Sequence, residues 1–312
     1  KSLDWNPDFL RINSQGQEDG VIENCKRILA SCSPLVLYEI GHGNTGPEMA
    51  KSFMEMGYQS CRLIPGLGIL VPFTITSTLA GFEQNLFFYK SGCAKTLLQQ
   101  GLLSHRSGDG FSLAAVSPAI WIDYLQSFPY MLQCLQLWQT YMSEHTSDPD
   151  WQAHQRALSA YSVSQLPGYD TSDRYCALIT GYELMTDLLQ RNATVSRLLT
   201  AIRMAVDLGY RADALRMLNH LYNIFDSEQA VSVDEPFLSV SARMAMIDPR
   251  SDIGQWLVYS VLETREICKE RSSHSDKSDL TDLELMRTST FYSDKMERRR
   301  QLIQTRVGID DG

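Results

Sequence analysis

Short apolar runs alternate with amphipathic stretches along the first hundred residues. The apolar runs cover residues 9–12, 35–40, 58–64, 69–73 and 85–89. Their lengths are typical of β-strands, whereas apolar residues spaced three to four apart over 21–29 indicate one face of a helix. A second helix is expected after a cap at Asn44 or Thr45, with Gly57 just beyond its end. This alternation predicts an α/β fold with a parallel, doubly wound sheet.

The predicted sheet is incomplete. Three or four strands are too few for a complete doubly wound sheet, so we expect a fold that starts in its middle. The turn at residues 65–68 follows a strand without opening a helix, and we expect it to form a hairpin-like connection.

Beyond residue 118 the pattern becomes almost entirely helical. Residues 104–118 are rich in Ser, Gly and Pro, so we expect a linker between a domain at 1–103 and a helical domain at 119–312. One helix is expected to begin behind the caps Thr171 and Ser172. The helix pair around Gly209 has the pattern of a tetratricopeptide hairpin, which favours a helical bundle or a short solenoid.

The longest apolar-looking stretch, residues 121–142, does not fit a membrane span. It contains Asp123, Pro129 and several glutamines. A span needs ~20 mostly apolar residues without such interruptions. We therefore expect a buried helix here, and no membrane-spanning segment.

Composition and charge narrow the class of protein. The chain has 28 basic and 37 acidic residues and a net charge of −9, which disfavours nucleic-acid binding. The run at 298–300 is three arginines flanked by Glu297, and we expect a solvated, salt-bridged helix face there. Seven cysteines without a Cys-x-x-Cys pair indicate reduced thiols, no metal site and a cytoplasmic protein.

Polar residues and glycines follow two of the predicted strands. One group spans residues 13–18 and the other spans residues 39–44. Ligands of open α/β sheets bind beyond the carboxyl ends of the strands. The two groups are therefore candidates for one binding site.

The first group carries a family resemblance. Residues 8–18 read Asp-Phe-Leu-Arg-Ile-Asn-Ser-Gln-Gly-Gln-Glu, which resembles the Asp-x-x-Lys-x-Asp-x-Glu-Gly-x-Glu signature of FkbM-type methyltransferases. The strand that ends at Glu39 is similar to the next strand of that family. The resemblance covers residues 2–90, and fainter likenesses at 234–238 and 297–302 resemble the tail of members with a helical extension.

The resemblance implies a partial Rossmann-like class I methyltransferase sheet and O-methylation with S-adenosylmethionine. The acceptor would be a hydroxyl of a sugar, glycan or secondary metabolite. A base must remove the hydroxyl proton, and Glu39 or His42 could serve. Asn13, Gln15 and Glu18 would position acceptor or cofactor. Asn13 stands where the signature has Asp, and Gln15 where it has Glu. An amide cannot take up a proton as a carboxylate does.

The cofactor-binding motif of that family is missing from the chain. No glycine-rich turn between a strand and a helix precedes residue 7, and the chain starts at Lys1. We therefore expect the N-terminus to be a cut, and the chain alone to be inactive and to bind S-adenosylmethionine poorly. The alternative is a non-catalytic, methyltransferase-like protein whose helical domain binds a partner protein.

Overall fold

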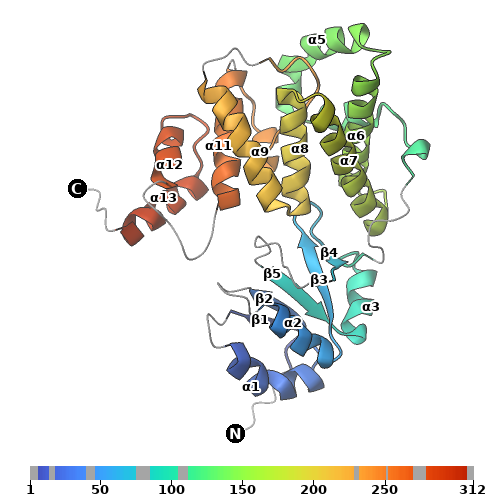
Figure 1. The fold of residues 1–312 in the computed structure, drawn as a ribbon, viewed down its shortest axis with the longest axis vertical. Coiled ribbons are helices and arrows are strands. Elements are labelled where there is room, and N and C mark those ends of the chain that lie inside the picture. The colour runs from blue at the N-terminus through green and yellow to red at the C-terminus, as the bar shows by residue number, and fades with distance from the viewer. Residues whose placement is uncertain are drawn as a thin grey trace. The chain divides into compact units, whose positions relative to one another are not determined.

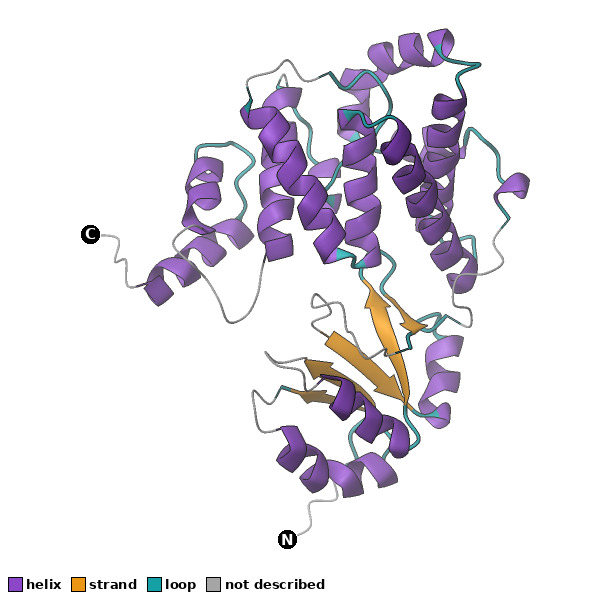
Figure 2. Ribbon diagram, viewed as in Figure 1, coloured by secondary structure: helices purple, strands orange, loops and turns teal. Residues whose placement is uncertain are grey.

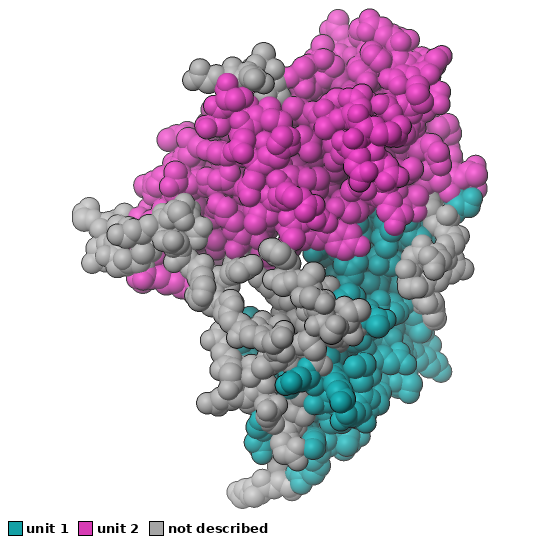
Figure 3. Space-filling view, viewed as in Figure 1, with its two compact units in different colours: residues 1–112, 163–179, 207–209 teal, residues 113–162, 180–206, 210–312 magenta. Residues whose placement is uncertain are grey.

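The computed structural model describes residues 6–13, 18–39, 46–74, 85–104, 112–227, 232–250, 252–269 and 279–307. They form a β-sheet with three helices, followed by a long series of helices (Figures 1 and 2). This confirms the expected order of an α/β part and an α-helical part. The chain divides into two compact units, coloured in Figure 3. Unit 1 comprises residues 1–112, 163–179 and 207–209, and unit 2 comprises residues 113–162, 180–206 and 210–312.

The sheet of unit 1 has five strands, each within a predicted apolar run. They are β1 (Phe9–Ile12), β2 (Leu35–Glu39), β3 (Gln59–Ile64), β4 (Ile69–Pro72) and β5 (Asn85–Tyr89). Their order in the sheet is β1-β2-β5-β3-β4. Helix α1 (Glu18–Ser31) follows β1, α2 (Gly46–Glu55) follows β2, and α3 (Ser91–Gln99) follows β5.

The prediction of a parallel sheet is wrong for most strand pairs, because the sheet is mixed. Among the described strands, only β1 and β2 are parallel, with Phe9 opposite Leu35. Strand β5 is antiparallel to both β2 and β3, and β4 is antiparallel to β3. A buried strand has the same apolar run in either direction, so the pattern could not reveal this reversal. Strands β1, β2 and β3 nevertheless share one direction, and their carboxyl ends lie at one edge.

Each face of the sheet has its own apolar core. On one face, α1 and α2 pack against alternate residues of β1, β2 and β5. The buried members of this core are Ile12, Leu29, Val36, Tyr38, Met49, Ala50, Phe53, Tyr58, Leu86 and Phe88. On the other face, α3 packs over β3, β4 and β5 through Cys61, Leu70, Tyr89, Leu97 and Leu103. Glu39 lies on this second face, because it is two residues beyond Leu37 and alternates with buried Tyr38.

The turn between β3 and β4 is the expected hairpin, and it makes close contacts within unit 1. The backbone N–H of Gly66 donates to the carbonyl oxygen of Asp207 at 2.9 Å. A Cβ at position 66 would lie 2.8 Å from Cα of Asp207 and closer still to its side chain. Nearby, Gly209 has a φ of +78° and lies against Pro65. Both glycines are therefore required by the structure, Gly66 for space and Gly209 for its backbone conformation.

Helices make up unit 2, and some of them extend into unit 1. They are α4 (Ile120–Leu125), α5 (Pro129–Glu144), α6 (Pro149–Gln165), α7 (Thr171–Arg191), α8 (Val195–Leu208), α9 (Arg211–Asp226), α10 (Ala242–Ala245), α11 (Ile253–Lys269), α12 (Asp279–Arg287) and α13 (Asp294–Val307). Helices α6 and α7 pack closely, because a Cβ at Gly181 would lie 3.2 Å from the carbonyl oxygen of Ala157. Helix α9 packs on α11, and α12 packs on α13.

The single buried helix expected over residues 121–142 is in fact two helices. Helix α4 ends at Leu125, and α5 starts at Pro129. Phe128 is extended, with φ −104° and ψ 132°, because the residue before a proline avoids helical geometry. Helix α5 is also partly exposed, since Leu132 is 75% accessible. Among the described residues, no helix combines the length and the apolar character of a membrane span.

The start of α7 differs in detail from the prediction. Asp170, rather than Thr171 or Ser172, caps the helix, because its carboxylate accepts from the backbone N–H of Ser172 and Asp173. The Thr171 hydroxyl donates to the carbonyl oxygen of Gly101 instead. Asp170, one residue before Thr171, is an equally good capping residue by type, so the sequence alone could not decide which of the three residues caps the helix.

Replacing Gly66 by Ala should lower the free energy of unfolding by about 1–3 kcal/mol, because the added methyl group must displace Asp207. Urea denaturation of the whole chain measures this change. Gly92→Ala is the matched control, since a Cβ there meets nothing within 4 Å and alanine favours the helix α3. Equal stability of wild type and Gly66→Ala would contradict the close approach.

Candidate functional site

Two of the predicted site residues meet at the carboxyl edge of the sheet. Asn13 directly follows β1, and Glu39 is the last residue of β2. Glu18 is the first residue of α1. His42 and Gln15 lie outside the described residues.

Arg11, Asn13 and Glu39 form what we call the edge cluster. Nη2 of Arg11 donates to Oε2 of Glu39 at 2.8 Å, and Nδ2 of Asn13 donates to the same oxygen at 2.9 Å. The side chain of Arg11 is 61% exposed and that of Glu39 is 19% exposed. Asn85, at the start of β5, lies opposite Glu39 in the register. Strand ends from β1, β2 and β5 thus bring polar groups together.

The edge cluster leaves one carboxylate oxygen for another group. Both described donors bind Oε2 of Glu39, and among the described residues none is bonded to Oε1. The amide at Asn13 suits this arrangement, since an ionised Asp could not donate and would repel Glu39. Asn13 therefore holds the Glu39 carboxylate in place, a role that the acid of the family signature could not fill.

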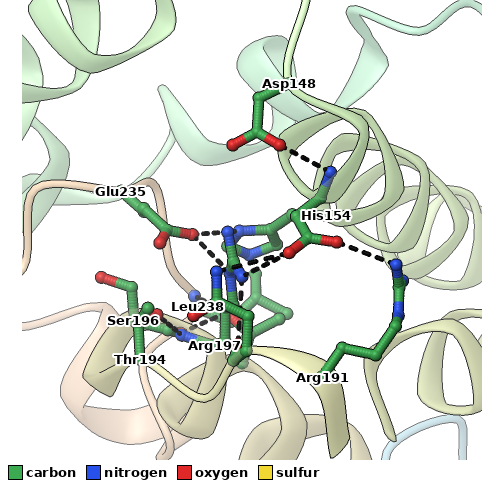
Figure 4. Close-up of polar contacts among 11 residues, drawn as sticks. Asp148, His154, Arg191, Thr194, Ser196, Arg197, Glu235 and Leu238 are labelled. Atoms are coloured by element: carbon green, nitrogen blue, oxygen red, sulfur yellow. Dashed lines mark hydrogen bonds and ion pairs between the residues drawn. The ribbon is translucent and has the colours of Figure 1, made fainter. Parts of the chain in front are cut away.

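A second polar cluster lies inside unit 2, and Figure 4 shows its side chains converging on one carboxylate. Glu235 Oε2 accepts from Nδ1 of His154 at 2.9 Å and from Nε of Arg197 at 2.8 Å. We call these three residues the buried socket. His154 belongs to α6, Arg197 to α8 and Glu235 to segment 232–241, which is neither helix nor strand. The side chains of His154 and Arg197 are 0% and 1% exposed.

Burial and charge fix the protonation states of the socket. Burial lowers the pKa of His154, and the opposing effect of Glu235 does not restore it. Burial alone would raise the pKa of Glu235, but His154 and Arg197 outweigh burial and lower it. The stable state is therefore an ionised Glu235 that accepts from Arg197 and from a neutral imidazole. Nε2 of His154 is then a buried acceptor with no hydrogen-bond partner among the residues that the structure describes.

Sequence patterns did not single out this socket. His154 shares a helix face with Trp151, Leu158 and Tyr161, all of them buried. An ionisable residue on such an apolar face was the one feature of the sequence that indicated a buried polar contact. Glu235 lies in the 234–238 segment that resembles the family tail, but nothing local predicts its partners. The three residues come from segments about 40 residues apart, so only the folded chain assembles them.

Within the described ranges, no three His, Cys, Asp or Glu side chains are placed to hold a metal ion. The seven cysteines are free thiols, and four of them are buried.

Arg197→Leu should cost about 3–5 kcal/mol of unfolding free energy, because it leaves the Glu235 carboxylate buried with its cation removed. Arg191→Leu is the control. Arg191 bonds Asp150, which also lies 3.8 Å from Arg197, but the Arg191 side chain is 55% exposed. Its loss should cost about 0–1 kcal/mol. Similar denaturation midpoints for the two variants would show that the socket does not stabilise unit 2.

In comparisons with protein-family models, with curated proteins and with solved structures, the chain matches none of them. The geometry of the sheet and of the edge cluster is therefore the basis for assigning a function.

Proposed function

We propose that unit 1 is the acceptor-binding side of an S-adenosylmethionine-dependent O-methyltransferase. The observation that carries this proposal is the reversed strand β5, inserted between β2 and β3, with the edge cluster at the carboxyl ends of β1 and β2. The acceptor is a hydroxyl group of a sugar, a glycan or a secondary metabolite.

The strand order supports the proposal. In a class I methyltransferase sheet, the last strand is antiparallel and lies between the two strands that precede it. Here β5 lies between β2 and β3, and β4 is an added hairpin strand outside β3. Strand β1 forms the other edge of the described sheet, where further parallel strands of such a sheet would pair.

The residues of this chain do not fit the cofactor itself. Residues 41–46 read Gly-His-Gly-Asn-Thr-Gly and come between the end of β2 and the start of α2, but the next strand, β3, ends at Ile64 and not at the acidic residue that would bond the cofactor ribose. The proposal therefore assigns cofactor binding to residues outside these 312. The cofactor would supply the methyl group, and the edge cluster would act on the acceptor alone.

The edge cluster can position an acceptor hydroxyl. Arg11 and Asn13 fix the Glu39 carboxylate through Oε2, which leaves Oε1 to accept the hydroxyl proton. Asn85 lies opposite Glu39 on β5 and can bond a second acceptor oxygen. Alignment of the attacking oxygen accounts for much of the rate of such a transfer, so fixed polar groups are useful there.

Calorimetric titration tests the assignment of the cofactor site. S-adenosylmethionine added to residues 1–312 should give no binding at micromolar concentration, because no acidic strand end follows the glycine-rich residues 41–46. S-adenosylhomocysteine should behave in the same way. Micromolar affinity for either compound would contradict the proposed division of cofactor and acceptor sites.

The role of Glu39 is tested in a longer protein that carries the cofactor-binding strands. Glu39→Gln should reduce transfer of tritiated methyl groups to hydroxyl acceptors by about 10²-fold, the scale of a positioned base. Glu55→Gln, at the exposed end of α2, is the matched control and should keep full turnover. The melting temperature of both variants should stay near wild type. Unchanged turnover in Glu39→Gln would remove Glu39 from the reaction.

A non-catalytic role is the second candidate, and helix α5 favours it. Leu132 and Leu137 are 75% and 51% exposed, on a helix whose only charged residue is Glu144. Such a surface is suited to a partner protein. If the longer protein transfers no methyl group while Leu132→Asp abolishes capture of a partner, this second function replaces the first.

A further inference from the structure

The segment 232–241, which is neither helix nor strand, is held inside unit 2 in two different ways. Its downstream part is anchored by aromatic packing and backbone bonds. Phe237 stacks on Tyr130 with ring centroids 5.4 Å apart, and the Tyr130 hydroxyl donates to the carbonyl oxygen of Phe237 at 3.0 Å. The N–H of Leu238 donates to the hydroxyl of Thr200 at 3.1 Å. None of the side chains or backbone groups in these contacts gains or loses a proton between pH 5 and pH 8.

The upstream part of the segment depends on charge. Glu235 is held by the buried socket, and the carbonyl oxygen of Val233 accepts from Nε1 of Trp138 at 3.3 Å. Pro236 separates the two parts and has no N–H of its own. Ser232 and Asp234 are exposed, so this end of the segment already borders solvent.

The charges around His154 balance only while its imidazole is neutral. Glu235 faces it from the segment and Arg197 faces it from α8, and these two form one ion pair. Asp150 on α6 is paired with Arg191 on α7 and lies 3.8 Å from Arg197. Asp148, just before α6, accepts from the backbone N–H of Asp150 at the positive end of that helix. Tyr141 on α5 lies near Glu235, and burial followed by this carboxylate raises the pKa of Tyr141 to about 12, so it stays neutral. A proton on Nε2 of His154 would therefore add one uncompensated charge to a fully buried site.

We propose that residues 232–236 form an acid-released latch, which opens at the Glu235 end when His154 takes up a proton, while Phe237 and the residues after it stay anchored. Opening exposes His154 and Glu235 to water, where the added charge is solvated. The inference is independent of the methyltransferase proposal, because it concerns unit 2 alone.

The sign of the pH dependence follows from the buried, neutral imidazole. Burial lowers the pKa of His154 in the closed latch, whereas in the open latch the ring returns toward its ordinary value of about 6.5. The closed form is therefore fully favoured above pH 6.5 and loses stability as the pH falls below it. Opening should become about fivefold more favourable between pH 6.5 and 5.5, and about tenfold per pH unit below that, until the closed-state pKa is reached.

Hydrogen exchange of the whole chain, followed by NMR between pH 7.5 and 5.5, tests this latch. After correction for intrinsic rates, exchange of the Trp138 indole N–H, which is bonded to the carbonyl oxygen of Val233, should rise about fivefold between pH 6.5 and 5.5. Exchange at the amide of Leu238, bonded to Thr200, should not change. A parallel rise at Leu238 would mean global destabilisation and would overturn the proposal, as would a flat profile at both groups.

Two histidine variants complete the test. His154→Gln keeps an amide that can donate to Glu235 but takes up no proton, so the Trp138 indole N–H should stay protected at pH 5.5. His220→Gln, at an exposed position of α9, is the matched control and should keep the wild-type response. If His154→Gln still shows the fivefold rise, another group controls the segment and the latch is disproved. If His154→Gln exchanges fast at every pH, the wild-type profile alone decides.

Discussion

The fold of unit 1 depends on the pairing of β5 with strands on both of its sides. Strand β5 hydrogen-bonds β2 along one edge and β3 along the other, so it joins the parallel pair β1–β2 to the hairpin β3–β4. Its side chains also serve both cores, since Leu86 and Phe88 face α1 and α2 while Phe87 and Tyr89 face α3. A strand with this position cannot be lost without separating the sheet into two ribbons, each too small to be stable alone.

Sequence patterns located the strands well because a buried strand needs a short apolar run, whichever way it points. The same patterns could not assign the direction of β5, since direction depends on which neighbours it meets. At the site, the polar strand ends correctly suggested that Asn13 and Glu39 would lie together, because the carboxyl ends of β1 and β2 share an edge. Arg11 was matched only to the Lys of the signature, although its guanidinium completes the edge cluster.

Long-range ion pairs were the least predictable feature. The arginines at 298–300 were expected to form a solvated, salt-bridged face; the salt bridges form, including one between Arg300 and Glu297, but of the three arginines only Arg298 is exposed. Arg299 is bonded to Glu266, and Arg300 is 3% exposed and bonded to Glu284 and Glu297. Adjacent residues on a helix point about 100° apart, so one run of like charge supplies both surface and interior. The buried socket has the same origin, since its partners are recognisable only after the helices have packed.

The division of the chain into units has a consequence for how such a protein can evolve. Unit 1 takes three separate stretches, residues 1–112, 163–179 and 207–209, and unit 2 takes the three that alternate with them. The tight approach of Gly66 to Asp207 joins two of the stretches of unit 1. Recombination of one contiguous gene segment therefore could not transfer either unit whole without taking part of the other. The sheet and the helices are accordingly expected to be inherited together, as one module with a shared history, rather than shuffled among unrelated proteins.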